Sequence, residues 1–414
     1  MKSLLATVCS FPLLAAFAAA QTSNYLVGLT RNTPVVNKRD QTTCTQLPIC
    51  SPPGFPPAVA QPYAGGTAYD PMRQGTWISN GVLLAEVDDN CNYICPPAPA
   101  PLVSPNAVVT GLEEVESLNQ VWMLDSFGNI YQMQYGCPPA VLNICNTGLG
   151  LVGNLATGGL AVDECNRLVF YSYSNWVTGA TQIHIATLAL PCQTIQVATP
   201  APCIPGTAPR PVTGLACDGC RNILYMTDGF TTIGWSYTVL PGPVVVFGAQ
   251  NCCTLPSPTP LGADPMIGLA VRSGGATSLG PTCSNGACPA CPMIHSLRNS
   301  PNLGNLAFGL DLTGASPGSL VWCIIGAGPC AGGGPVIPPL CGPIFTGPTL
   351  GTLGPVVAPP SLPCSAFVTF NMPLPMLPGF CGVVLSSQCA ALCPASSGIG
   401  TSLSNCLSWE LQSN

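Results

Sequence analysis

Residues 159–175 read GLAVDECNRLVFYSYSN, and residues 214–229 read GLACDGCRNILYMTDG. Each stretch begins with a glycine and a short apolar run, passes through a polar turn and ends in a run of β-branched or aromatic residues. Such runs on either side of turn residues are typical of two antiparallel strands joined by a tight turn. The two stretches therefore predict a repeated hairpin and, with it, an all-β fold.

The same pattern recurs along the first two thirds of the chain. The initial glycines of successive copies are 45 to 55 residues apart, and in four copies an aromatic residue follows the glycine by eleven positions. Third strands are expected after each hairpin. Three or four strands at this period are typical of a β-propeller blade, which packs face to face with its neighbours. The repeat glycines are Gly66, Gly111, Gly159, Gly214 and Gly268, and the aromatic residues are Trp77, Trp122, Phe170 and Tyr225.

The fifth copy lacks the aromatic residue, and a strand-like stretch at residues 25–30 has no blade of its own. We expect this N-terminal strand to pair with residues 266–272, closing a ring of about five blades, because pairing would remove two exposed sheet edges. We also expect the four aromatic residues to be buried between neighbouring blades.

Residues 60–275 resemble the blades of the NHL and YWTD β-propeller families, and residues 224–228 (LYMTD) come near the YWTD pattern itself. The resemblance implies a propeller but no particular activity, because that fold carries hydrolases, lyases, receptors and scaffolds alike. From residue 302 onward, strand-like segments with very few charges predict a small β-sandwich. This part loosely resembles the apolar C-terminal β-modules of exported bacterial proteins whose role is unknown.

The N-terminal residues predict export. Lys2 precedes an apolar run, and the small residues 18–20 form a cleavage site of the signal-peptide type. We therefore expect a secreted, extracellular or cell-surface protein. The expected organisation is a signal peptide at 1–20, a β-propeller-like repeat domain at 21–272, a cysteine-rich linker at 273–301 and a β-sandwich module at 302–414.

The chain has 25 cysteines, and removal of Cys9 with the signal peptide leaves an even number. Exported chains meet oxidising conditions, so disulfides are expected. Because short loops close with little loss of entropy, we expect cysteines that are near neighbours in sequence to pair. The expected bridges are Cys44 with Cys50, Cys91 with Cys95, Cys137 with Cys145, Cys192 with Cys203 and Cys217 with Cys220.

Composition excludes several classes of protein. Only 26 of 414 residues are charged, whereas a typical domain has about 25% charged residues. The net charge of −6 and the absence of a basic cluster argue against nucleic-acid binding. Glycine and proline together number 92, which opposes long helices. We expect no transmembrane segment after cleavage of the signal peptide.

The sequence offers candidate residues for three kinds of site: a zinc site, a calcium or other divalent-ion site, and a catalytic site. Cys217-x-x-Cys220 and Cys288-x-x-Cys291 have the spacing of zinc knuckles, but export favours disulfides. Asp88, Asp89 and Glu113 to Glu116 offer oxygen ligands without the spacing of a known calcium loop, so calcium remains the one cofactor left open. NHL-like lactonases hold a divalent ion at the axis, and the matching acids here are Asp163 and Asp218, which the pattern favours as caps of turns. His184 and His295 lie in no recognisable catalytic motif.

These observations favour a non-catalytic structural or adhesive protein of a cell surface or proteinaceous wall. Low charge reduces repulsion between copies, and dense cysteine locks domains together. Expected partners are other surface or wall proteins, or glycans. The alternatives are a metal-dependent lactonase-like hydrolase and a module that binds a glycan or a protein.

Overall fold

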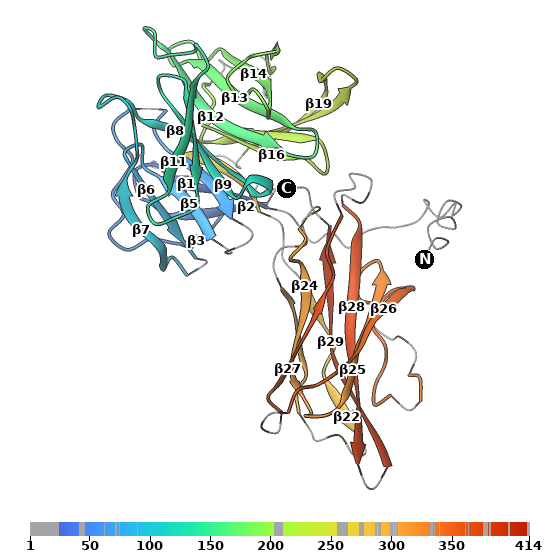
Figure 1. Cartoon of the computed structure of the whole chain (residues 1–414). Helices are drawn as coiled ribbons and strands as arrows, with labels where there is room; N and C mark the ends of the chain where they lie inside the picture. The colour runs from blue at the N-terminus through green and yellow to red at the C-terminus, as the bar shows by residue number, and fades with distance from the viewer. Residues whose placement is uncertain are drawn as a thin grey trace.

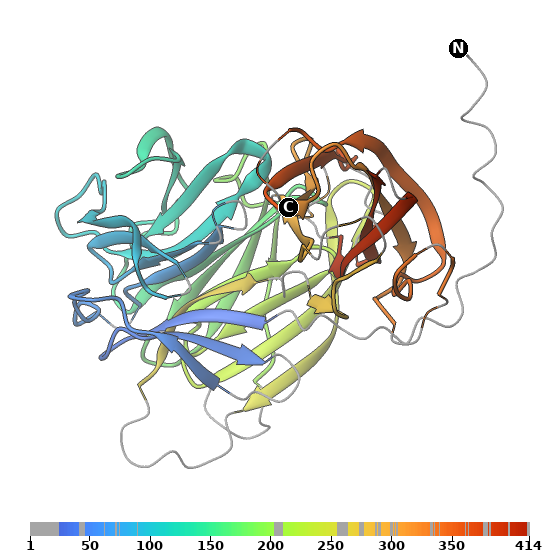
Figure 2. The ribbon, with the colours of Figure 1, turned by 90° about the horizontal axis from the view of Figure 1, so that it is seen from below.

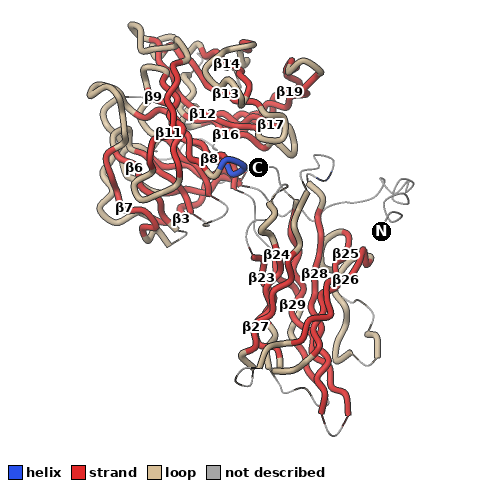
Figure 3. Tube along the Cα trace, in the orientation of Figure 1, coloured by secondary structure: helices blue, strands red, loops and turns tan. Residues whose placement is uncertain are grey.

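The computed structural model describes the chain except residues 1–24, 41–45, 62, 71–72, 74, 89, 203–209, 255–263, 273–276, 286–287, 289–290, 299–300, 302, 304, 332–333, 335, 339, 361, 363, 376–379, 381, 396–397 and 412–414. Strands dominate the described residues, and the helical element among them is one 3-10 turn, η1 (Glu116–Leu118). Figure 1 shows two parts, one coloured blue to yellow and one orange to red, and Figure 3 shows the same trace by secondary structure. The predicted signal peptide lies outside the described residues.

The N-terminal part contains five four-stranded antiparallel sheets among the described residues. In order from the inner to the outer strand, the first sheet is β4 (Gly66–Asp70), β5 (Gly75–Ser79), β6 (Leu83–Val87) and β7 (Tyr93–Pro99). The second is β8 (Val109–Val115), β9 (Gln120–Asp125), β10 (Asn129–Gln134) and β11 (Ala140–Asn146). The third is β12 (Leu155–Asp163), β13 (Leu168–Asn175), β14 (Thr181–Thr187) and β15 (Gln196–Ala198). The fourth is β16 (Gly214–Asp218), β17 (Ile223–Thr227), β18 (Thr231–Leu240) and β19 (Val244–Thr254).

The fifth sheet joins the two ends of the repeat part. Its order is β20 (Met266–Arg272), β1 (Tyr25–Thr30), β2 (Val36–Asp40) and β3 (Gln46–Cys50). Tyr25 pairs with Arg272 and Thr30 with Met266, so the expected pairing of the N-terminal strand is confirmed. Figure 2 shows these blue strands beside the yellow strand. The N-terminus supplies three strands, where the sequence had indicated one.

The inner strands of the five sheets contact one another in cyclic order. β4 contacts β8, β8 contacts β12, β12 contacts β16, β16 contacts β20, and β20 contacts β4 again. Four-stranded antiparallel sheets arranged in this way form a β-propeller-like fold.

The five repeat glycines explain this close approach of the inner strands. A Cβ atom on Gly111 would lie 2.6 Å from the backbone nitrogen of Leu160, and one on Gly159 would lie 2.7 Å from that of Leu215. Each repeat glycine faces the backbone of the next copy in this way, and Gly268 faces Gly66 and Thr67 to complete the circle. The glycine marker in the sequence is therefore required because backbone packs directly on backbone around the axis.

The four repeat aromatic residues occupy equivalent second strands, β5, β9, β13 and β17, and all four are buried. Trp77 packs in a cluster with Leu112 of the second sheet, and Trp122 in one with Leu160 of the third. Phe170 and Tyr225 make the corresponding contacts with the fourth and fifth sheets. The expectation that these side chains form the core between sheets is confirmed.

The outer strands were only partly expected. Residues 96–105 are rich in proline, a composition typical of a loop, but Tyr93–Pro99 form β7. β7 is the outermost strand of its sheet, and proline is tolerated at a sheet edge because its missing N–H need not pair with a further strand.

The C-terminal part consists of two antiparallel sheets around one hydrophobic cluster. The larger sheet follows the order β21 (Thr277–Leu279), β29 (Gly398–Glu410), β28 (Val384–Ala395), β25 (Leu320–Ala327) and β26 (Thr349–Val357), with β22 (Cys283–Asn285) also paired to β29. The smaller sheet is β23 (Ile294–Arg298), β24 (Gly309–Ala315) and β27 (Ala366–Asn371). Phe308 and Trp409, with ring centroids 5.2 Å apart, belong to the shared cluster.

The interpretation of residues 273–301 as a linker is wrong. β21, β22 and β23 fall in this segment, and they pair with β29 and β24 of the C-terminal sheets. The segment looked like a linker because its strands are short and rich in serine and cysteine. Pairing with the long strand β29 stabilises short segments as strands, although their own sequence does not predict strands.

Disulfides link consecutive sheets of the repeat part. The bridges are Cys50–Cys91, Cys95–Cys137 and Cys145–Cys192. In each, a cysteine of an outer strand joins the loop between the third and fourth strands of the next sheet. The cysteines thus form a repeating set of bonds between neighbours in the ring.

The expected pairing of near neighbours in sequence is wrong wherever it can be checked. Cys50, Cys91, Cys95, Cys137, Cys145 and Cys192 are all bridged, but to other partners than expected, while Cys44 and Cys203 lie outside the described residues. Cys217 keeps a thiol although Cys220 is disulfide-bonded. Cysteines that are close in sequence do not pair because they pack against different neighbouring sheets. Cys91 belongs to the cluster shared with the fifth sheet, and Cys95 belongs to the cluster shared with the second sheet.

An ion pair connects the two parts of the molecule. Arg221, in the turn after β16, donates from Nη2 to Oε1 of Glu410 at the end of β29, over 3.2 Å. The same guanidinium also contacts Asp218 over 3.3 Å. Among the described residues, no helix has the length and apolar character needed to cross a membrane.

Candidate functional site

Three of the inner strands end in an acid. Asp70, Asp163 and Asp218 end β4, β12 and β16. Each accepts a hydrogen bond from the backbone N–H three residues later, over 3.0, 3.0 and 3.1 Å. This is the geometry by which an aspartate caps a tight turn. The expectation that Asp163 and Asp218 cap turns is confirmed.

At this position the fifth sheet has Arg272, and the second sheet has Val115 in place of the aspartate. Its turn is capped instead by Glu164 from the third sheet, whose carboxylate accepts from the backbone N–H groups of Glu116 and Ser117 over 2.7 and 3.0 Å. The cap therefore crosses from one sheet to the next. Burial raises the pKa values of both Asp163 and Glu164.

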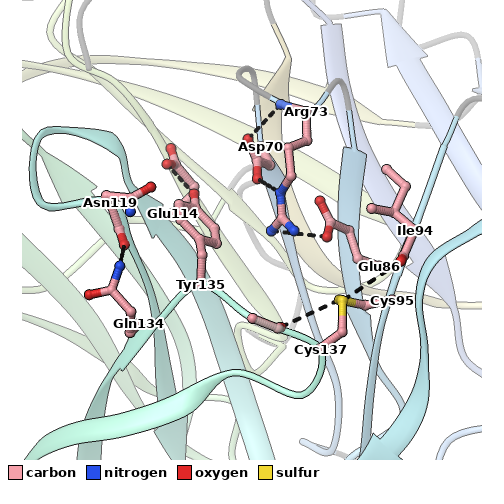
Figure 4. A network of polar contacts seen from close by, with 11 residues as sticks. Asp70, Arg73, Glu86, Ile94, Cys95, Glu114, Asn119, Gln134, Tyr135 and Cys137 are labelled. Carbon is pink, nitrogen blue, oxygen red and sulfur yellow. Dashed lines mark hydrogen bonds and ion pairs between the residues drawn. A yellow bond between two sulfur atoms is a disulfide. The ribbon is translucent and has the colours of Figure 1, made fainter.

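A buried ionic network extends this group between the first and second sheets (Figure 4). Arg73 donates from Nε to Asp70 over 2.8 Å, and its Nη2 lies 3.0 Å from a carboxylate oxygen of Glu86 as an ion pair. Its guanidinium also lies 4.6 Å from the ring centroid of Tyr135, and the Tyr135 hydroxyl hydrogen-bonds to Glu114. Burial raises the pKa of Glu86 to about 7, despite the opposing effect of Arg73.

Further carboxylates crowd this region. Desolvation raises the pKa values of Glu113 and Glu114, and it raises that of Glu116 to about 8, with added repulsion from Glu164 and Asp70. With a pKa of about 8, Glu116 is mostly protonated at neutral pH. It can therefore couple the stability of the fold to pH, because protonation removes both repulsion and the desolvation of charge.

The acids considered for calcium have local roles. Asp88 accepts from the backbone N–H groups of Asn90 and Asn92, over 2.8 Å each, and so caps its own turn. Asp89 lies outside the described residues. Glu113 hydrogen-bonds to the backbone, and Glu114 to Tyr135. In the described residues no three carboxylates converge closely enough for one ion.

The cysteines with zinc-knuckle spacing do not form a zinc site in this structure. Cys288 is bridged to Cys393 and Cys291 to Cys364, so neither can act as a thiolate ligand in this state. The Cys217 sulfur lies 3.1 Å from the Tyr237 hydroxyl, which donates to Asp163 over 2.5 Å. Burial raises the pKa of the Cys217 thiol well above its usual range, which opposes nucleophilic reactivity.

The two histidines are both in the core. His184 in β14 stacks on Tyr171, with ring centroids 5.7 Å apart, and burial lowers its pKa. His295 in β23 is 2% exposed, and burial lowers its pKa to about 4. Both imidazoles are therefore neutral at physiological pH.

Sequence reasoning missed one convergence. The side chains of His295, Cys323 and Cys389 bring their ligand atoms within 4.8 Å of one another, and this is the one such group of three in the described residues. The residues come from β23, β25 and β28, and no short motif joins them. Two of them, Cys323 and Cys389, are bonded as a disulfide.

No family model matches the chain, and no curated protein matches its sequence. Among solved structures, the chain is similar to one titled "Crystal structure of Nidogen/Laminin Complex", with 11% identity, a TM-score of 0.37 and coverage of 60% of this chain and 98% of the other. It is also similar to one titled "Crystal Structure of Mitotic Checkpoint Complex", with 9% identity, a TM-score of 0.30 and coverage of 62% and 77%. At these scores the propeller-like assignment rests on the sheet topology.

Proposed function

We propose that this protein is an exported structural or adhesive component of a cell surface or proteinaceous wall. We infer a closed propeller of five blades followed by a β-sandwich as its architecture. The observation that carries the proposal is the repeating set of bonds between neighbouring sheets. Cys50–Cys91, Cys95–Cys137 and Cys145–Cys192 each tie one outer strand to the next sheet.

This arrangement suits durability. Each bridge closes a loop of about forty residues, and such loops restrict the unfolded chain by about 3 to 4 kcal/mol each. These bridges lie at the periphery and the repeat glycines pack at the axis, so the fifth, first, second and third sheets are held at both their inner and their outer strands. Secretion and an extracellular location are part of the proposal, because bridges of this kind persist in oxidising compartments.

The carboxylates support a structural role in preference to a catalytic one. Asp163, the counterpart of a lactonase metal ligand, accepts hydrogen bonds from Asn166 and Tyr237. These contacts use its oxygens to hold a turn and to join the third and fourth sheets. The proposal therefore treats these acids as structural and takes calcium to be absent from the working protein.

Exposed apolar strands at the sheet edges support association with other molecules. β11 exposes Leu142 by 56%, and β26 exposes Leu350 by 64%. Both are terminal strands of their sheets among the described residues, so one row of backbone groups faces outward. β26 has no charged residue, and exposed edges without charges favour pairing with another chain.

Fractionation of the producing cells tests the structural role. The protein should stay in the insoluble surface fraction in detergent alone and be released when a dithiol reductant is added. Leu350→Lys should lower self-association in sedimentation, with Leu306→Lys, an exposed loop position, as the matched control. Release by detergent alone would oppose covalent incorporation.

An activity panel tests the hydrolase alternative. The oxidised protein is assayed on lactones, esters and glycans with and without calcium, and we expect no turnover. Turnover that is abolished by a chelator and by Asp163→Asn, but retained in Asp88→Asn, would overturn the structural role. Asp88 is the suitable control because it caps an exposed turn.

A further inference from the structure

The convergence of His295, Cys323 and Cys389 lies between the two sheets of the C-terminal part. His295 belongs to β23 of the smaller sheet, and the two cysteines belong to β25 and β28 of the larger sheet. Cys323 and Cys389 are directly opposite in the strand register, with Cα atoms 4.0 Å apart. All three side chains are buried, and both cysteines are fully inaccessible.

Both ring nitrogens of His295 are buried, and neither makes a well-directed hydrogen bond among the described residues, although the backbones of Asn405 and Ser387 interact with the ring and oppose the fall in its pKa. The backbone N–H of His295 donates to Asn405 over 2.8 Å. Buried polar atoms without a partner are rare in native proteins, and each calls for an explanation. Imidazole and thiolate are ligands that a borderline ion such as Zn²⁺ prefers, so these three side chains offer a suitable ligand set once the sulfur atoms are reduced.

We propose that, in the dithiol state, His295, Cys323 and Cys389 form a Cys2His site for Zn²⁺, and that the Cys323–Cys389 disulfide is the metal-free form of this site. The two states exclude each other, because a sulfur atom in a disulfide carries no thiolate charge. The site is available to a newly made, reduced chain before its bridges form.

Formation of the zinc site balances in electrons and protons, and the oxidation state of zinc does not change. A dithiol reductant gives two electrons and two protons to the Cys323–Cys389 bond, which becomes two thiols while the reductant becomes a disulfide. Zn²⁺ then displaces the two thiol protons and takes a lone pair from the imidazole. The two sulfur atoms move apart to about 3.8 Å, the separation set by tetrahedral Zn–S bonds of about 2.3 Å. The three ligand atoms start within 4.8 Å of one another.

Oxidative refolding of the full chain provides the test. The reduced, denatured protein is refolded in a glutathione buffer with and without excess ZnCl2, and free thiols are alkylated before non-reducing peptide mapping. We expect zinc to lower the yield of the Cys323–Cys389 bridge at least tenfold relative to that of Cys330–Cys406. The latter is a matched bridge of the same part of the molecule, and it lies outside the convergent group.

Two variants make the result specific. His295→Gln should abolish most of the selective effect of zinc, whereas His184→Gln, at the other buried histidine, should leave it unchanged. If His295→Gln does not refold, Co²⁺ binding to the reduced wild-type chain is compared with that to a Cys323→Ala, Cys389→Ala double variant. A thiolate-to-cobalt absorption band lost in the double variant supports the site.

Three outcomes would overturn the proposal. The first is an equal yield of the Cys323–Cys389 bridge with and without zinc. The second is an equal fall in every bridge, which would mean that zinc binds thiols without selection. The third is a cobalt band of the same intensity in the double variant.

Discussion

Gly159→Ala should destabilise the fold much more than a glycine-to-alanine change normally does. The added Cβ would lie 2.7 Å from the backbone nitrogen of Leu215 and 3.0 Å from the carbonyl carbon of Gly214. These are backbone atoms of β16, so relief requires movement of a whole strand rather than rotation of a side chain. Overpacking of a close-packed interior is typically destabilising by about 1 to 3 kcal/mol. We expect a loss of about 3 kcal/mol, at the upper end of that range.

Urea denaturation of the disulfide-intact protein measures this loss, and hydrogen exchange in β12 and β16 locates it. Gly351→Ala is the matched control, because Gly351 also lies in a strand but has no atom within 4 Å of the added methyl group. That variant should be within about 0.5 kcal/mol of wild type, or slightly more stable, since alanine restricts the unfolded chain. Equal stability of the two variants would refute backbone packing as the reason for the repeat glycines.

Three other predictions concern the core, the acids and the thiol. Trp122→Ala should lower the free energy of unfolding by about 3 to 5 kcal/mol, because the side chain is fully buried between two sheets; a loss below 1 kcal/mol in the same assay would contradict this. Burial raises the pKa of Glu86 from 4.5 to about 7, so between these pH values the folded state holds a proton that the unfolded chain has lost. The resulting stability, about 3 kcal/mol, is fully present below pH 4.5 and is lost as the pH rises through 7. Denaturation at pH 5 and pH 8 should show lower stability at pH 8, with a smaller difference in Glu86→Gln, and a rise in stability at pH 8 would show that the sign is wrong. The Cys217 thiol is half-buried, and desolvation raises its pKa. It should therefore be alkylated more slowly in the native protein than after unfolding, and equally fast labelling of the two states would contradict this.

The hairpin repeat could be predicted from the sequence because the interactions that form it are local. Period-2 alternation, β-branched residues and turn-capping acids act within about twenty residues, so the GLAVDECNRLVFYSYSN stretch predicted the hairpin of β12 and β13. The structure extends β12 back to Leu155, before the repeat glycine. The pairing in the fifth sheet could also be inferred, because residues 25–30 and residues 266–272 are each left without a complete blade and can pair with one another. Burial of the four aromatic residues followed from their equivalent places.

The candidate site was predictable only in part. Asp163 and Asp218 end strands before turns, which is enough to predict capping. The cap from Glu164 onto the second sheet could not be read, because it depends on which sheets are neighbours. The raised pKa values of Glu86, Glu114 and Glu116 likewise arise from packing between sheets, since no single stretch of sequence sets the depth of burial.

The sequence by itself determined the hairpin strands, the turns and the period of the repeat, since these depend on interactions within one copy. It also marked the positions of the repeat glycines and aromatic residues, because these recur at a fixed spacing. Only the tertiary structure decided which cysteines pair, because Cys91 and Cys95, four residues apart, face different neighbouring sheets. It also decided that β21 to β23 belong to the C-terminal part and that His295 meets Cys323 and Cys389. Those contacts join residues far apart in the chain, and their free energy depends on the packing of whole sheets, which no local pattern records.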